Sequence, residues 1–255
     1  MYELIDSHAH LESFKNLKEV VRRAERIGVK AIVGVGSDYN SSKYVLKISE
    51  EEYVSKIYPA IGVHPWSLHS SNLDLNLTFK FIESNVDRAV ALGEVGLDYW
   101  LKNVRKNPVE KEFQRNVFRK ILDIAKDNDK PVIIHSRGAW SDCLTMVLEA
   151  GVKKAVFHWF SGPSDVLKKL LNHGYFISAT PAAEYSKYHQ EAILNTPLER
   201  ILLETDSPVS YLGKTAEPAD VVRTLKAVSK LKEVEEGEVA AKTTENALKV
   251  FDINL

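Results

Sequence analysis

The stretch Ile5-Asp6-Ser7-His8-Ala9-His10 ends the first apolar run of the chain, residues 2–5. Side chains alternate between the two faces of a β-strand, so His8 and His10 are expected on one face and Ala9 on the other. Two neutral imidazoles at that separation suit a divalent metal of the zinc, manganese or iron kind. The alternative is two unrelated polar residues where a strand frays into a loop, and the HxH pattern alone hardly separates the two interpretations.

The same arrangement, an apolar run that ends in a polar group, recurs along the chain between helical patterns. The apolar runs predict strands at residues 2–5, 31–36, 57–63, 89–93, 131–134, 155–157, 175–178 and 201–203. Apolar residues at helical spacing predict helices at residues 16–27, 38–51, 76–85, 109–127, 139–150, 163–171, 185–194, 219–232 and 244–251. Strands and helices therefore alternate from one end of the sequence to the other.

This alternation predicts an α/β fold, a (β/α)8 TIM barrel of the metal-dependent hydrolase type. Runs that are apolar on both faces indicate parallel strands covered by helices. An open doubly wound sheet usually carries a glycine-rich loop after its first strand, where this chain has HxH. The 255 residues also match the roughly 250 of a typical barrel. Because no proline- or glycine-rich linker interrupts the pattern, we expect one domain over residues 1–255.

Composition restricts the class of protein further. The chain is 44% hydrophobic and 27% charged with a formal net charge of −1, so it has no overall positive field to attract long nucleic acid. A polyanionic substrate would need local charge, which a metal centre supplies. The single cysteine, Cys143, rules out an internal disulfide and is expected to be buried. Without a signal-like segment or an apolar run near ~18 residues, we expect a cytoplasmic protein with no membrane contact and no stable protein partner.

Potential metal ligands follow six of the predicted strands or lie at their ends. In a closed barrel the carboxyl ends of the strands form one rim, where barrel active sites lie. Six of these side chains would face one bowl: His8, His10, Glu94, His135, His158 and Asp206. Each has a structural alternative on its own; His135 could bond a loop carbonyl, and Asp206 could cap the turn at Ser207-Pro208. Mixed histidine and carboxylate ligands without a thiolate indicate a hydrolytic metal centre.

These motifs carry a resemblance to a known family. IDSHAHL, GVHP, GEVGLDYW, IIHSR, FHWFSG and LLETDSP resemble, in this order, the signatures of the TatD-like metal-dependent hydrolases, the TatD DNase family of the amidohydrolase superfamily. TTENALKVF, near the end of the chain, resembles the closing element of the same family. The resemblance runs from the first predicted strand to the last.

The resemblance implies two divalent metal ions, which could be magnesium, manganese or zinc. His8, His10 and Asp206 would hold the first ion, His135 and His158 the second, and Glu94 would bridge them. Asp206 is also the expected acceptor for the proton of an activated water. These roles imply a hydrolase in which Asp206 and Glu94 are catalytic.

The function implied by the resemblance is that of a deoxyribonuclease, 3′→5′ exonuclease-like, which cleaves phosphodiester bonds through a two-metal-activated water. Its substrate would be DNA or a short single-stranded nucleic acid. One alternative is hydrolysis of ester or amide bonds at the same centre, for example deacylation of an aminoacyl-tRNA. Another alternative is a barrel that only binds a partner, although such a protein has no need of six converging chelators.

The sequence departs from the family pattern at three positions beside the predicted ligands. Trp66 replaces the second histidine of the common HPH, Gly138 replaces the aspartate of HxRDA, and Trp159 replaces the cysteine of HCFSG. Next to these positions, we expect Arg137 to bind a phosphate with its guanidinium fork, with His64 as a weaker candidate for the same contact. The alternative for Arg137 is a helix-start arginine paired with a surface carboxylate.

Each of the four tryptophans closely follows a predicted rim motif. We expect the exposed indoles of Trp66 and Trp100 to stack on unpaired bases, and Trp140 and Trp159 to pack beneath loops over the bowl. A basic cluster follows Trp100 and could hold phosphates that lead away from the scissile bond, unless it is simply a solvated loop: Lys102, Arg105 and Lys106.

Overall fold

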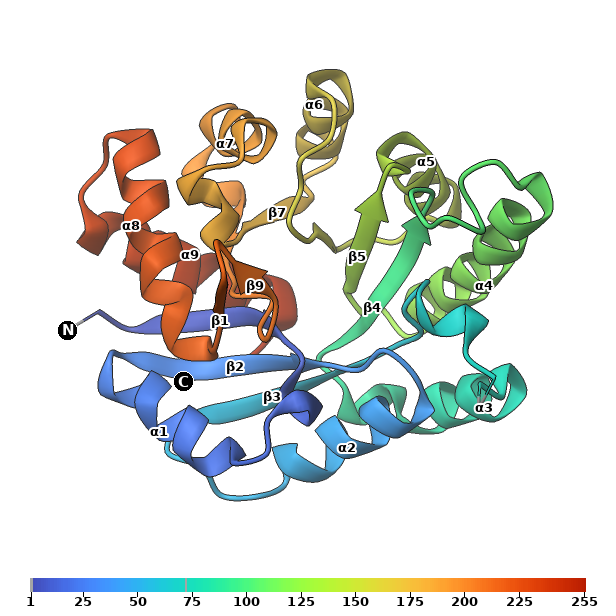
Figure 1. The fold of residues 1–255 in the computed structure, drawn as a ribbon, viewed down its shortest axis with the longest axis horizontal. Helices are drawn as coiled ribbons and strands as arrows, with labels where there is room; N and C mark the ends of the chain where they lie inside the picture. Colours follow the sequence, from blue (N-terminus) through green and yellow to red (C-terminus); the bar gives the residue numbers. More distant parts are fainter. Residues whose placement is uncertain (1, 72) are drawn as a thin grey trace.

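The computed structural model describes residues 2–71 and 73–255, and within them one sheet contains eight parallel strands in the order β1 to β8 (Figure 1). The strands are β1 (Leu4–Ala9), β2 (Val29–Val35), β3 (Lys56–Ile61), β4 (Ala91–Asp98), β5 (Val132–Arg137), β6 (Ala155–Phe157), β7 (Phe176–Ala179) and β8 (Ile201–Leu203). The main helices are α1 (Leu17–Arg26), α2 (Tyr39–Ser49), α3 (Leu75–Asn85), α4 (Pro108–Asp127), α5 (Trp140–Ala150), α6 (Ser164–Asn172), α7 (Lys187–Leu194), α8 (Val221–Lys232) and α9 (Glu236–Phe251). The predicted alternation and barrel class are confirmed.

The barrel is closed between its first and last strands by the loop after β8. The Asp206 N–H donates to the carbonyl of His8 (3.0 Å), and the His10 N–H donates to the carbonyl of Ser207 (2.8 Å). A parallel bridge joins Ala9 to Ser207 at the same place. Two predicted ligand segments, one from each end of the chain, are thereby joined directly to each other.

The core has an inner and an outer layer. Inside the barrel, aliphatic side chains from the strands pack together, among them Ile5, Val33 and Ile133. Residues Ala247, Val250 and Phe251 of α9 join this inner cluster, so α9 packs against the interior side chains. The outer layer lies between the strands and the other helices, which surround the sheet in Figure 1. Cys143 is fully buried in this outer layer, as expected.

Irregular strand pairing turns the key side chains inward. In β1, Ile5 belongs to the inner cluster while Ala9 belongs to the outer one, and the pairing with β2 shifts register between Asp6 and Ala9. In β4, the pairing with β5 shifts between Leu92 and Val95, around Glu94. Such bulges re-aim side chains and are common beside active sites. The alternation of side chains between the two faces of the strand therefore holds from His8 onward but not through the whole of β1.

The element bounds differ from the predicted ones first in β1, which runs to Ala9 and not only to Ile5 because its pairing with β2 continues to Gly34. The strands β4 and β5 run further, because their pairing continues to Asp98 and Arg137 although the residues turn polar. Helix α9 begins at Glu236 and not near residue 244, because its exposed first turn with Gly237 hides the helical pattern, which becomes apolar only at Val239. A short hairpin of β9 (Ser210–Tyr211) and β10 (Lys214–Thr215) was not predicted. No helix within residues 2–71 and 73–255 is long and apolar enough to span a bilayer.

Candidate metal centre

Glu94 lies at the centre of a ring of histidines on the carboxyl rim of the barrel, and it is only 1% exposed. Its Oε2 is 3.2 Å from His8 Nε2 and 3.3 Å from His10 Nε2. Its Oε1 is 2.8 Å from His135 Nδ1, 2.9 Å from His158 Nε2 and 3.2 Å from His64 Nε2. The two oxygens of one carboxylate thus face two separate sets of imidazoles, the arrangement that a bridging ligand requires.

Asp206 completes the first set. Its Oδ1 is 3.5 Å from Nε2 of both His8 and His10. The loop after β8 holds it there through the backbone bond from Asp206 to His8. All six predicted ligands therefore meet at one place.

His64 lies deeper in this cluster than a substrate contact alone requires. Its Nε2 is 3.2 Å from His135 Nδ1, and His135 Nδ1 is in turn 3.4 Å from His158 Nε2. His64 is 6% exposed, and its Nδ1 accepts the backbone N–H of Trp66 (3.0 Å). With its Nε2 directed at Glu94, His64 is a further candidate ligand for the second set.

The cluster fits divalent metal ions. Ligand atoms of His8, His10 and Glu94 lie within 4.8 Å of one another, as do those of His64, Glu94 and His135. Among the described residues, neither ring nitrogen of the buried His8 has a hydrogen-bond partner of acceptable geometry. A buried imidazole left in this way is costly unless another group satisfies it. Imidazole and carboxylate ligands suit zinc and manganese, and the carboxylates also suit magnesium.

Burial and mutual attraction shift the protonation of the cluster when no metal is bound. Burial alone would lower the pKa of His10, but hydrogen bonds to Asp206 and Glu94 outweigh it and raise the pKa to about 10. Burial opposes ionisation of Glu94, yet the charges of the surrounding histidines hold its pKa well below the usual range. For His64 burial dominates and lowers the pKa to about 4, so His64 is neutral near pH 7.

Two buried carboxylates support the histidines of the second set, and the sequence prediction gave them no role. Asp98 Oδ2 accepts from His135 Nε2 (3.1 Å), and Glu204 Oε1 is 3.3 Å from His158 Nδ1. Each carboxylate stands behind an imidazole whose other nitrogen faces Glu94. Their signal in the sequence was an acidic residue close behind an apolar run, Asp98 in the motif GEVGLDYW and Glu204 in the motif LLETDSP.

A third buried carboxylate, Asp6 of β1, links the first strand of the barrel to the segment that follows the last strand, β8. Its Oδ1 accepts the backbone N–H of Thr205 (2.9 Å), and its Oδ2 accepts the Thr205 hydroxyl (2.6 Å). The bond lies between the segments that carry His8 and Asp206, so Asp6 helps to fix their relative position.

A cavity of about 1240 Å³ opens above the cluster. It is bordered by all four tryptophans, and two of these are well exposed, Trp66 at 54% and Trp100 at 57%. Trp140 and Trp159 are half-buried and also border the cavity. The cavity extends between α6 and α7, where Leu167 and Tyr188 border it.

Arg137, at the end of β5, borders the cavity as expected for a substrate contact. Its Nε is 2.9 Å from Asp98 Oδ2, and its guanidinium lies 5.2 Å from the centre of the Trp66 ring. The carboxylate beside it is therefore buried, unlike the surface carboxylate of the alternative interpretation. The basic cluster Lys102, Arg105 and Lys106 is exposed in the loop between β4 and α4, outside the cavity lining.

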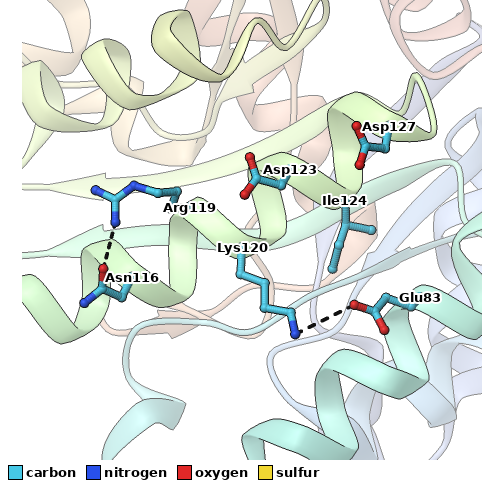
Figure 2. Close-up of a pocket in the computed structure, with 7 residues that line it drawn as sticks. All are labelled: Glu83, Asn116, Arg119, Lys120, Asp123, Ile124 and Asp127. Carbon is cyan, nitrogen blue, oxygen red and sulfur yellow. Dashed lines mark hydrogen bonds and ion pairs between the residues drawn. The ribbon is translucent and has the colours of Figure 1, made fainter.

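A second hollow, of about 470 Å³, lies between α3 and α4 on the outer surface (Figure 2). Lys120 faces Glu83 there at 3.8 Å, and Arg119 donates to Asn116 (2.7 Å). Its charged residues come from two exposed helix faces, and no histidine is among the described residues that line it. We find no candidate chemistry in it.

Fold and site together define a metal-dependent hydrolase built on a (β/α)8 barrel. The sequence model of the family described as TatD related DNase matches residues 5–252, and the chain belongs to this family. The chain is 33% identical over 263 residues to the uncharacterized metal-dependent hydrolase YabD of Bacillus subtilis, covering 98% of this chain and 100% of that protein. It is 32% identical over 260 residues to human deoxyribonuclease TATDN3, covering 97% and 94%. The crystal structure of YJJV, a TatD homologue of Escherichia coli K12, superposes with a TM-score of 0.87 at 25% identity and 98% coverage of both chains.

Proposed function

We propose that the protein is a deoxyribonuclease of the 3′→5′ exonuclease-like kind, acting on a strand end or a short single-stranded nucleic acid. The observation that carries this proposal is the His and carboxylate cluster around Glu94 at the base of a cavity walled by tryptophans. The names of relatives such as human deoxyribonuclease TATDN3 agree with it.

In this proposal His8, His10 and Asp206 would hold one divalent metal ion, His135 and His158 would hold a second, and Glu94 would be a ligand shared by both. The ions are magnesium, manganese or zinc. When bound, they supply Lewis acidity and an activated water for hydrolysis of the phosphodiester. Asp206 accepts the proton of the attacking water at its Oδ atoms, and it is ionised and able to do so because the His10 hydrogen bond outweighs burial and lowers its pKa.

Arg137 and the exposed tryptophans hold the substrate. With Nε directed at Asp98, the two terminal nitrogens of the Arg137 guanidinium remain to bind a phosphate in a fork. His64, neutral and directed at Glu94, serves the scissile phosphate or the second ion. Trp66 and Trp100 offer exposed rings on which unpaired bases stack, worth about 1–3 kcal/mol per base.

The charges of the cavity favour a strand end over a continuous strand. Among the described residues that line it, Arg137 is the one arginine or lysine, whereas Glu12, Glu94, Glu191 and Asp206 are acidic. Bound metal ions and Arg137 can balance one phosphodiester and little more. A run of phosphates through the whole cavity would meet Glu191 on α7 and Glu12 beside β1.

The test is cleavage of a 3′-labelled and a 5′-labelled oligonucleotide by metal-loaded protein, beside generic ester and amide substrates. Hydrolysis of the oligonucleotide from its 3′ end supports the proposal. Turnover confined to esters or amides would favour the deacylase alternative. Metal analysis of the purified protein identifies the ions.

The salt dependence of binding reports how many phosphates the protein contacts. For single strands the slope of log K against log salt is about −0.7 for each neutralised phosphate. A slope of roughly −0.7 to −1.4 is expected if one or two phosphates are held. If the basic cluster contributes, replacing Lys102, Arg105 and Lys106 by alanine makes the slope shallower; an unchanged slope identifies the cluster as a solvated loop.

A further inference from the structure

One buried carboxylate connects the candidate metal centre to the candidate substrate contacts. Asp98, at the end of β4, is 0% exposed. Its Oδ2 accepts from His135 Nε2 (3.1 Å) and from the Trp66 indole Nε1 (2.6 Å), and lies 2.9 Å from Arg137 Nε. Its Oδ1 accepts the backbone N–H of Trp100 (3.0 Å). Groups from the end of β5 and from the loops after β3 and β4 thus converge on a single side chain.

The backbone of Asp98 is itself fixed from two sides. Its N–H donates to Gln114 Oε1 on α4 (2.9 Å), and its carbonyl accepts from Gln114 Nε2 (3.4 Å). In the sheet Asp98 is the register partner of Arg137, at the last position of the β4–β5 ladder. The carboxylate therefore has a defined position before any ligand arrives.

The contact with His135 determines which ring nitrogen is free to bind a metal. If Nε2–H donates to Asp98, then Nδ1 carries the lone pair, and Nδ1 is the atom 2.8 Å from Glu94 Oε1. A carboxylate behind a ligating imidazole fixes its tautomer and orientation and makes it more basic. Loss of such a partner typically lowers metal affinity about 10- to 100-fold.

The contacts with Trp66 and Arg137 extend this control to the substrate. Both side chains border the cavity, Trp66 exposed and Arg137 half-buried, and at their inner ends Trp66 donates to, and Arg137 forms an ion pair with, the same carboxylate oxygen that holds His135. Arg137 also lies over the Trp66 ring, so the two are likewise in contact with each other. A displacement of Asp98 is transmitted to all three.

We propose that Asp98 is a positioning residue that sets the orientation of His135 for metal binding and, through the same oxygen, the orientation of Trp66 and Arg137 for substrate binding. The second half rests on the proposed function of Trp66 and Arg137. Metal loading and the substrate contacts are coupled through this carboxylate.

The experiment titrates chelator-treated protein with Mn²⁺ alone by calorimetry and compares Asp98→Asn with the wild type. Asparagine keeps the shape but loses the charge, so Mn²⁺ affinity is expected to fall about 10- to 100-fold. The matched control is Asp142→Asn, a carboxylate that accepts from Tyr99 and Arg115 outside the centre and whose loss should leave Mn²⁺ affinity unchanged. Affinity of Asp98→Asn within twofold of wild type, or an equal loss in Asp142→Asn, overturns the proposal.

The substrate half has its own measurement. At saturating Mn²⁺, Asp98→Asn is expected to raise KM for an oligonucleotide, whereas Trp66→Phe should raise KM and leave Mn²⁺ affinity intact. An unchanged KM in Asp98→Asn refutes the coupling. Because the metal titration needs no nucleic acid, a protein whose Mn²⁺ affinity depends on Asp98 but which leaves oligonucleotides intact would disprove only the proposed function.

A second readout leaves Asp98 unchanged and serves if Asp98→Asn fails to fold. Mn²⁺ binding at His135 should alter the fluorescence of the Trp66 indole through their shared carboxylate. We expect the response to be lost in Trp66→Phe and kept in Trp159→Phe. A wild-type response in Trp66→Phe would contradict the coupling.

Discussion

Gly138 and Trp100 fit each other so closely that changing either should affect substrate binding. Gly138 has a φ of +70°, and a Cβ built on it would lie 2.4 Å from both Cδ1 and Nε1 of the Trp100 indole. The indole is anchored at its backbone by Asp98 and packs edge-to-face on Trp140 at 5.7 Å between ring centres. The aspartate that many family members carry at this position could not coexist with Trp100 in its observed place.

We predict that Gly138→Ala lowers stability modestly and raises KM strongly. A non-glycine residue in the left-handed region costs about 1–2 kcal/mol. In a chain of this size that corresponds to a fall in Tm of roughly 2–8 °C. Trp100 is 57% exposed, so it can swing outward and relieve the overlap. Its loss as a stacking surface, worth about 1–3 kcal/mol, should raise KM for single-stranded oligonucleotide by roughly 5- to 150-fold.

The assay combines thermal unfolding with KM at saturating metal for Gly138→Ala, Trp100→Ala and the double variant. If the methyl group acts by displacing Trp100, the double variant has the KM of Trp100→Ala, while the Tm penalty of Gly138→Ala persists. Two results would refute the reasoning: a wild-type KM in Gly138→Ala, or KM increases that multiply in the double variant.

The other predictions concern the centre itself. Asp206→Asn and His135→Ala should fold, as judged by circular dichroism, but lose turnover, because rim positions contribute little to the barrel core; near-normal kcat in Asp206→Asn would refute its role as proton acceptor. Arg137→Lys should raise KM on an oligonucleotide, because an ammonium cannot form the guanidinium fork; unchanged KM and kcat would dismiss the phosphate role. Metal at 100 times its Kd should stabilise chelator-treated protein by about 2.7 kcal/mol in denaturant unfolding, and an unchanged midpoint would argue against a metal site. Calorimetry should show proton release on metal binding and weaker binding at lower pH, because His10, with its pKa raised to about 10, must lose a proton to become a ligand.

The sequence was sufficient to predict the barrel and the meeting of its ligands. Parallel strands that are apolar on both faces indicate a sheet covered by helices, and closure of this sheet into a barrel brings every strand end to one rim. This is why His8 and Asp206, almost 200 residues apart, could be expected at one site. The prediction tolerated errors of several residues in the bounds of β4 and β5, because the ligand positions depend on strand order more than on strand length.

The supporting carboxylates could not be predicted in this way, because their roles depend on contacts between strands. Asp98 ends β4 and Glu204 follows β8, and a solvated turn would look the same in the sequence. What distinguishes them is complete burial against a histidine from another part of the rim: His135 on the neighbouring strand β5 for Asp98, and His158, after β6, for Glu204. The register shifts in β1 and β4 could not be predicted from the sequence either, because they follow from pairing with β2 and β5.

The departure at Trp66 shows how a contact can survive a change of residue. From the sequence alone, tryptophan in place of the second histidine of HPH means the loss of a polar substrate contact. In the structure the indole keeps a ring N–H, which histidine also possesses, and directs it inward to Asp98 at 2.6 Å. The remainder of the ring is exposed to the cavity beside Arg137. The substitution therefore keeps a ring N–H directed at the buried carboxylate that also contacts His135, and it enlarges the flat surface offered to the substrate.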